Sequence, residues 1–266
     1  MKNYKMIIQY EGTRYQGWQR QESHDNTIQG KLETVLSKMT GVFVQVHGAG
    51  RTDAGVHALG QTANFHVAES IVREKGLTPE QMMEYINCYL PEDIAVVAME
   101  EVPERFHSRL LAKEKTYCYR VLNSEIPHIF DRRYVYELAQ NLDVACMRSA
   151  AAFLTGQHDF KSFTSNKRGK KSTVRTVYEI RIEECGEELR FVYRGDGFLY
   201  HMVRILTGTL LEVGMGKRKP EDMKQILEAK NREQAGFLVP GKGLTLVKVT
   251  YAQTKKGECR AIDEGE

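Results

Sequence analysis

The sequence predicts an α+β fold made of two halves that repeat one order of elements. Three observations lead to this prediction. Runs rich in β-branched and aromatic residues alternate with apolar stretches at helical spacing. The predicted order is β-α-β-β-α-β in both halves. The chain, with 266 residues, is long enough to bury a core in one large or two smaller domains.

The first half has strong local signals. Apolar residues recur at helical spacing over 27–39, and Gly41 follows as a stop signal. A capping box at Thr78 and Gln81, with Pro79 between them, begins a second helix that ends near Pro91. The predicted strands of this half are residues 4–10, 42–47, 61–67 and 94–102. This order is the split βαβ, or ferredoxin-like, unit.

The second half repeats the pattern. Its predicted strands are residues 115–122, the two arms of a hairpin around Cys185 and Gly186 (173–184 and 188–195), and 243–251. Its predicted helices are residues 142–156 and 198–213, with a short charged helix added from Pro220. We therefore expect two tandem ferredoxin-like (RRM-like) halves, residues 1–106 and 107–266, which meet near 104–112. Such sheets offer a broad face for single-stranded RNA, with aromatic side chains as stacking platforms.

Composition, net charge and cysteine spacing indicate an ordinary globular protein and not a zinc or membrane protein. Apolar residues make up 41% of the chain and charged residues 27%, as in ordinary globular proteins. The net charge of +3 is small, so any role in nucleic-acid binding must come from local patches. Five scattered cysteines show no zinc-site spacing, which favours reduced thiols in the cytoplasm. Because neither a signal sequence nor a membrane-spanning run is present, we expect a soluble cytoplasmic protein with no membrane partner.

A glycine-rich stretch, GAGRTDAGVHALG at residues 48–60, surrounds one arginine and one carboxylate. Glycine lets a backbone adopt positive φ and lets another molecule approach closely. Asp53 is a candidate catalytic group here, because a loop between two strands presents it from a rigid scaffold. The alternative is an ordinary hairpin loop in which Asp53 bonds to nearby backbone N–H groups.

Arg204 lies in the predicted helix 198–213, which is apolar nearly all round and is therefore expected to be buried. A buried guanidinium is costly unless it is paired and hydrogen-bonded. It is either one member of a structural ion pair or a cation that keeps a catalytic carboxylate ionised. Asp53 is the partner that we predict.

Tyr117 shares one strand face with Tyr119 and Val121, because side chains alternate along a strand. Such a face is either core or a platform on which a base stacks. Basic residues also gather at three places, and Tyr15, Trp18 and Phe106 are interleaved with them at the first two, which suits phosphate contacts along an RNA. These basic residues are Arg14 and Arg20; Arg105, Arg109, Lys113 and Lys115; and Lys167, Arg168, Lys170, Lys171 and Arg175. Sequence signatures of nucleotide hydrolysis, hydride transfer and zinc chemistry are missing.

The stretch GAGRTDAGVHALGQ closely resembles the catalytic loop of the TruA family of tRNA pseudouridine synthases. Further segments fall in the order of that family, so the resemblance spans essentially the whole chain. They are YEGTRYQGWQRQ (10–21), LPEDIAV (90–96), FHSRLLAKEKTYCYRV (106–121), HDFKSF (158–163), GFLYHMVRILTGTLLEVG (197–214) and GLTLVKVTY (243–251).

The resemblance implies a role for each matching residue. Asp53 is identified with the catalytic nucleophile, and Arg204 with the arginine that pairs with it. Tyr117 matches the tyrosine that stacks on the target uracil, and Arg51 the arginine that holds the target nucleotide out of its stack. Arg109 and Arg20 are further candidates for substrate binding.

The resemblance also implies the fold and the substrate. The expected fold is two similar halves that share one extended sheet around a basic cleft, and the working form is a homodimer. The expected substrates are uridines at positions 38 to 40 of the tRNA anticodon stem-loop, and neither a cofactor nor a catalytic metal is expected. Two alternatives stay open, namely an RNA-binding protein without catalysis and a synthase that modifies another position.

Overall fold

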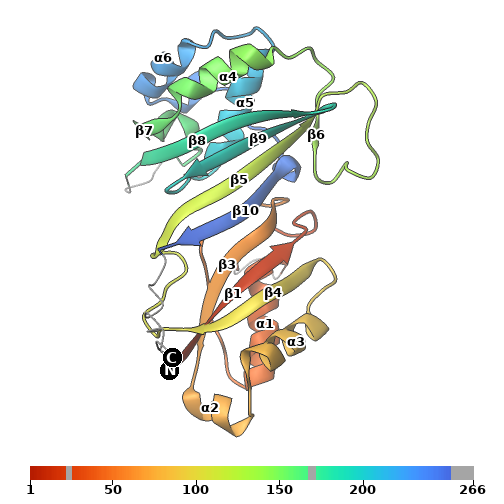
Figure 1. Ribbon diagram of the computed structural model, residues 1–266, viewed down its shortest axis with the longest axis vertical. Coiled ribbons are helices and arrows are strands. Elements are labelled where there is room, and N and C mark those ends of the chain that lie inside the picture. Colours follow the sequence, from red (N-terminus) through yellow and green to blue (C-terminus); the bar gives the residue numbers. More distant parts are fainter. Residues whose placement is uncertain (22–25, 167–171, 253–266) are drawn as a thin grey trace, which may run out of the picture.

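A computed structural model describes residues 1–21, 26–166 and 172–252 (Figure 1). The strands are β1 (Lys2–Tyr10), β2 (Val46–Gly48), β3 (His57–Val67), β4 (Ile94–Val102), β5 (Ala112–Leu122), β6 (Tyr136–Glu137), β7 (Gly156–Asp159), β8 (Val174–Cys185), β9 (Glu188–Gly195) and β10 (Leu244–Tyr251). The α-helices are α1 (Ile28–Thr40), α2 (Glu69–Glu74), α3 (Pro79–Tyr89), α4 (Val144–Phe153), α5 (Met202–Gly214) and α6 (Asp222–Ala229). Three 3₁₀ turns are η1 (Phe160–Phe163), η2 (Arg232–Gln234) and η3 (Gly241–Gly243).

Both halves have the same strand arrangement. In the first half the neighbouring strands run β4-β1-β3, with β2 paired to β3, and in the second half they run β10-β5-β9-β8. Numbered within each half, both orders are 4-1-3-2. The predicted ferredoxin-like order is therefore confirmed in each half, and the two halves form one continuous sheet.

The two halves join where β10 lies beside β3. This pairing is parallel and short, with His57 opposite Thr245 and Ala58 opposite Leu246, whereas β10 pairs with β5 along most of its length. Gly60 allows the close approach, because a Cβ atom there would lie 2.5 Å from the carbonyl oxygen of Val247. The C-terminal strand thus brings loops from the two halves together.

One face of each half is buried. In β1 the side chains of Tyr4, Met6, Ile8 and Tyr10 are buried, while the alternate residues are more polar. Apart from Asn3, which is also buried, this alternation indicates a sheet covered by helices on one face. Figure 1 shows the helices in two groups at the two ends of the long axis, with α4, α5 and α6 at one end and α1, α2 and α3 at the other.

Several predicted elements have different bounds, and three of these differences have local reasons. The strand expected at 42–47 is reduced to β2, because side chains of α1 hold its backbone: Val44 N donates to Ser37 Oγ, and Val46 N donates to Glu33 Oε1. The helix expected at 142–156 begins at Val144, since the side chain of Asp143 caps it. Short elements such as α2, β6 and β7 were not predicted.

The third difference concerns the helix expected at 198–213. It begins only at Met202, because His201 has a left-handed backbone with φ 64°.

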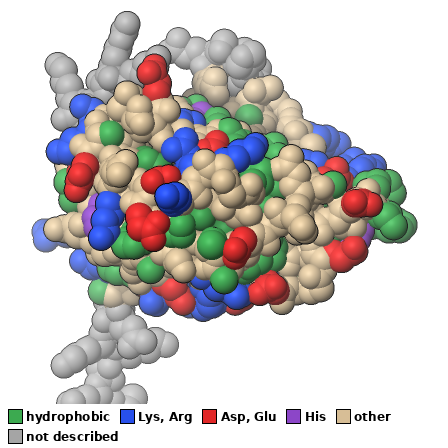
Figure 2. Space-filling view, turned by 90° about the horizontal axis from the view of Figure 1, so that it is seen from above, with side chains coloured by type: hydrophobic (Ala, Val, Ile, Leu, Met, Phe, Trp, Pro, Cys, Tyr) green, Lys and Arg blue, Asp and Glu red, His purple; other side chains and the backbone are tan. Residues whose placement is uncertain are grey.

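No helix in the described ranges is long and apolar enough to cross a membrane. Basic and acidic side chains are interspersed over the face in Figure 2, in keeping with the small net charge.

Candidate active site

The loop 49–56, which joins β2 to β3, carries Asp53. Its backbone is tied to the segment that follows β1: Trp18 N donates to Thr52 O at 3.0 Å, and Gly55 N donates to Tyr15 O at 3.4 Å. The hydroxyl of buried Thr52 shares a hydrogen bond of 2.8 Å with Tyr10. Because its polar backbone groups have internal partners, the loop presents Asp53 in a fixed position.

Two glycines of this stretch serve the packing of the protein itself. A Cβ atom at Gly48 would lie 2.5 Å from the ring of Trp18, and Gly60 admits β10 as described above. We expected these glycines to let an RNA backbone approach. At Gly48 and Gly60 the close neighbour is instead the chain's own ring or strand.

Asp53 and Arg204 form an ion pair across the two halves. Arg204 Nη1 donates to Asp53 Oδ2 at 3.1 Å, and Arg204 Nε donates to Val239 O at 2.8 Å. Only 12% of the Arg204 side chain and 19% of the Asp53 side chain are exposed. The guanidinium is therefore both paired and hydrogen-bonded, as a largely buried cation must be. Asp53 is the partner that the sequence predicted.

His201 also faces Asp53, and sequence reasoning missed it. Its Nε2 lies 3.6 Å from Asp53 Oδ2, and its Nδ1 lies 2.9 Å from Ser165 Oγ. Burial lowers the pKa of His201 below 6.5, and Arg204 and Arg232 add to this while Asp53 opposes it. Its place three residues before Arg204 at a helix start was a usable signal, because residues three apart share a helix face.

Aromatic side chains form the wall of the site. Tyr117 is 7% exposed, and its ring meets that of Phe198 edge to face, with centroids 5.4 Å apart. Burial raises the pKa of Tyr117, with Tyr10 and Asp53 adding to the rise, so its hydroxyl stays protonated. Tyr200, which was not predicted, is half exposed and stacks on His201 at 3.7 Å.

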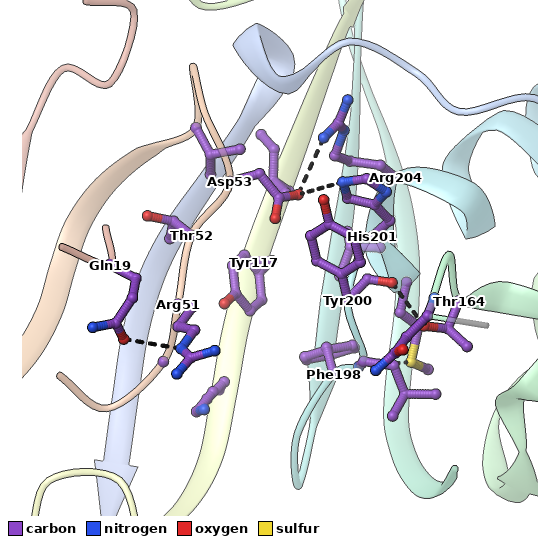
Figure 3. A pocket seen from close by; sticks show the side chains of 18 of the residues that line it. Gln19, Arg51, Thr52, Asp53, Tyr117, Thr164, Phe198, Tyr200, His201 and Arg204 are labelled. Carbon is purple, nitrogen blue, oxygen red and sulfur yellow. Dashed lines mark hydrogen bonds and ion pairs between the residues drawn. The ribbon is translucent and has the colours of Figure 1, made fainter. Parts of the chain in front are cut away.

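These residues line a cleft of about 1100 Å³ between the halves (Figure 3). Tyr117 extends from the same face of β5 as Tyr119 and Val121, the face that packs on α5. The cleft therefore opens on the helix-bearing side of the sheet, whereas we expected the open sheet face to meet RNA.

Besides Arg204, five cations of the described ranges line the cleft: Arg51, Arg109, Lys115, Lys161 and Arg175. Arg51 is exposed and donates to Gln19 Oε1 at 3.0 Å, and Arg109 is exposed as well. Lys115 Nζ donates to Ala49 O at 2.8 Å. Burial lowers the pKa of Lys115 to about 8, with Arg109 and Arg175 adding to the effect. Arg175 completes this group, which gives the cleft its basic lining.

Arg20 and the lysine-rich stretch are the remaining basic residues that the sequence predicted to bind RNA. Arg20 does not line the cleft; it pairs with Glu33 at 3.3 Å and lies over the ring of Phe43. Four basic residues of the lysine-rich stretch, Lys167, Arg168, Lys170 and Lys171, fall outside the described residues. Across the described ranges, no group of three or more His, Cys, Asp or Glu residues has the arrangement of a metal site.

Comparisons with known proteins show the family of the chain. The family model described as "tRNA pseudouridine synthase" matches residues 6–109 and 150–252. The tRNA pseudouridine synthase A of Bacillus sp. (strain KSM-64) is 48% identical over 237 residues, which cover 89% of this chain and 95% of that protein. The tRNA pseudouridine synthase A 1 of Clostridium tetani is 47% identical over 251 residues, covering 94% of this chain and all of its relative. The tRNA pseudouridine synthase A 2 of Bacillus cereus (strain ZK / E33L) is 45% identical with the same coverage.

Proposed function

The chain belongs to the tRNA pseudouridine synthase family, and from this premise we propose that it converts uridine to pseudouridine at positions 38 to 40 of the tRNA anticodon stem-loop. The chain is an isomerase that acts on tRNA. The proposal adds the position and the catalytic group, with Asp53 as the nucleophile. It includes a homodimer as the working form and the cytoplasm as the location.

The arrangement of the Asp53 carboxylate is the observation that carries the proposal. Arg204 and His201 both approach Oδ2, while within the described ranges no hydrogen bond reaches Oδ1. In Figure 3 this second oxygen points into the cleft, above Tyr117. The Arg204 guanidinium provides the positive charge beside the carboxylate that we propose as the nucleophile. One oxygen is thus fixed by the protein and the other is available to a substrate.

The reaction suits a site that supplies only positioned side chains. The C1′–N1 bond of uridine breaks, the freed uracil turns, and a C1′–C5 bond forms. The uracil loses the proton on C5 and gains one on N1, so atoms and electrons balance without a redox partner. Three steps are open to Asp53 Oδ1 as a nucleophile or base in this proposal: attack on C1′, attack on the base, and removal of a sugar proton.

The cleft walls suit a flipped-out nucleotide. A paired base must leave its stack before it can react, at a cost of roughly a few kcal/mol. Tyr117 recovers part of this through stacking, and Phe198 braces its ring from the edge. Arg51 is exposed and lines the cleft, which supports a role in filling the vacated space or in binding phosphate.

Mapping pseudouridine on unmodified tRNA tests this proposal. Purified wild-type protein should introduce pseudouridine at positions 38 to 40, whereas Asp53→Ala should introduce none. Pseudouridine at another position only would keep the reaction and replace the proposed target. No pseudouridine with wild type, despite tight tRNA binding, would instead support an RNA-binding protein without catalysis.

The homodimer needs a separate test. The loop between β5 and β6 offers an apolar surface, with exposures of 72% for Ile126, 58% for Ile129 and 96% for Phe130. It lies at the right-hand edge in Figures 1 and 2. Light scattering on the purified protein should give twice the chain mass; a single chain mass would remove the dimer from the proposal.

A further inference from the structure

His201 has a backbone conformation that few side chains adopt. Its φ is 64° and its ψ is 2°, directly before α5, and among the described non-glycine residues only Lys230 (φ 48°) also has positive φ. Left-handed backbone is unfavourable for an L-residue with a Cβ atom, and glycine adopts it most easily. Strained residues of this kind concentrate at functional sites. A histidine at this position therefore indicates that the imidazole side chain has a role that glycine cannot fill.

The left-handed turn is held by Thr164 and Ser165, which directly follow η1. Thr164 Oγ1 donates to Tyr200 O at 3.0 Å, and Ser165 N donates to the same carbonyl at 3.4 Å. The imidazole is then confined between the Tyr200 ring, stacked at 3.7 Å, and the Ser165 hydroxyl. These contacts direct Nε2 toward Asp53, as Figure 3 shows.

The neighbours of the ring determine its tautomer. If Nδ1 carried the proton, the lone pair of Nε2 would face a carboxylate oxygen, which is repulsive. If Nε2 carries the proton, Ser165 donates its hydroxyl to Nδ1 and Nε2–H points at Asp53 Oδ2. The separation of 3.6 Å exceeds a hydrogen bond, but catalytic hydrogen bonds often shorten only when substrate is bound.

We propose that His201 is a positioning residue for Asp53: its Nε2–H and Arg204 together hold Oδ2, so that Oδ1 stays directed at the substrate. This inference rests on the proposed function. Arg204 approaches from one turn further along α5, so the two donors converge on one oxygen from one helix start. Two donors on a single oxygen fix the rotation of the carboxylate, which a single ion pair does not.

The charges around the ring give this role a pH dependence. Asp53 faces it from the β2–β3 loop, Arg204 from α5 and Arg232 from η2, while Ser165 and Tyr200 are uncharged neighbours. Burial, and then the two arginines, lower the pKa of His201 against the opposing effect of Asp53, so the ring is neutral at neutral pH. Below the pKa of His201, Nδ1 is protonated and no longer accepts a hydrogen bond from the Ser165 hydroxyl.

Two substitutions separate positioning from a structural role. Glycine fits the left-handed backbone better than histidine, so a purely structural role predicts that His201→Gly keeps full activity. We expect instead that kcat falls roughly ten- to hundredfold, as for loss of a hydrogen bond to a charged group, with KM and thermal stability unchanged or improved. His201→Gln places an amide N–H near the position of Nε2, so it should restore most of kcat and remove the His201 contribution to the low-pH limb.

The assay follows tritium release from C5 of uridine in tRNA as a function of pH. Lys230→Gly is the control, because it relieves the same kind of backbone strain away from the cleft and should leave kcat unchanged. Wild-type kcat in His201→Gly would overturn the inference and leave the proposed function intact. No tritium release by wild type on any tRNA would overturn the proposed function, and the inference with it.

A second readout needs no turnover. Nitrogen NMR of the His201 ring should show a protonated Nε2 and an unprotonated Nδ1 in wild type, and a mixture of tautomers in Ser165→Ala. A predominant Nδ1–H form in wild type would overturn the inference even if the enzyme is active.

Discussion

Arg204 Nη1 lies 3.1 Å from Asp53 Oδ2, although 151 positions separate the two residues in the chain. Asp53 belongs to a loop of the first half and Arg204 to a helix of the second. The pair is largely buried, so each charge depends on the other for its stability. Neither half therefore carries a complete site by itself.

The Asp53→Asn substitution should separate chemistry from binding. Asparagine has nearly the same shape and keeps an acceptor for Arg204, but it has no anionic oxygen to act at the sugar or base. We expect turnover below detection and a tRNA Kd within about threefold of wild type, because the phosphate contacts supply most of the affinity. Single-turnover pseudouridine formation and filter binding measure the two quantities. Asp222→Asn, on α6, is the matched control, and an equal loss of binding would contradict the prediction.

Replacing Arg204 should show how much its contacts to Asp53 and Val239 O contribute to kcat and to stability. Lysine keeps the charge but cannot donate at once to Asp53 and to Val239 O, so we expect kcat to fall about ten- to hundredfold. Arg204→Met leaves the carboxylate of Asp53 unpaired and should lower the free energy of unfolding by about 3 kcal/mol.

Urea unfolding and a double-mutant cycle check this stability effect. Adding Asp53→Asn to Arg204→Met should recover part of the lost stability, because the unpaired charge is removed. Strict additivity of the two single changes would show that the pair contributes no coupling energy.

Two glycines form a matched pair for testing the rigidity of the loop that carries Asp53. Gly17 has φ +91°, and a Cβ atom there would lie 2.6 Å from Thr52 O, whereas Gly55 has φ +74° and open space around it. Gly55→Ala should cost only the backbone strain, about 1–2 kcal/mol. Gly17→Ala adds a clash with the backbone next to Asp53, so it should also lower kcat by about tenfold or more. Similar kcat values in the two variants would contradict a role for loop position.

Lys115 should make tRNA binding depend on pH. Its pKa is lowered to about 8, so the cation present at pH 7 is lost as pH rises through 8. We expect affinity to weaken between pH 7 and 9.5, and the slope of log K against log salt to shrink by about one unit. Lys115→Gln should bind more weakly at pH 7 and show neither change; the same pH response in this variant would assign the titration to another group.

Lys115 should also make the free energy of unfolding depend on pH, in a direction that follows from its lowered pKa. The folded protein releases this proton near pH 8, whereas the unfolded chain retains it to about 10.5. The unfolded state therefore binds more protons between these values, and wild-type stability should rise with pH in this window relative to Lys115→Gln. Denaturant unfolding at pH 7.5 and 9.5 measures this difference.

The main helices and strands, and their order, were predictable from the sequence. The repeated β-α-β-β-α-β pattern, the capping box at Thr78 and the stop at Gly41 were predictable, because each depends on residues close together in the chain. The glycine-rich loop with Asp53 was recognisable for the same reason, since its motif is one continuous string.

Tertiary structure alone decided which of these residues meet. The short pairing of β3 with β10 sets the distance between the Asp53 loop and α5, and no local pattern encodes it. The left-handed His201 and the position of Arg20 beside Glu33, outside the cleft, likewise depend on contacts between distant segments. The spacing of residues in a sequence predicts on which face of a helix or strand a side chain lies. A site also requires side chains from different elements to lie close together, and that depends on how the elements pack.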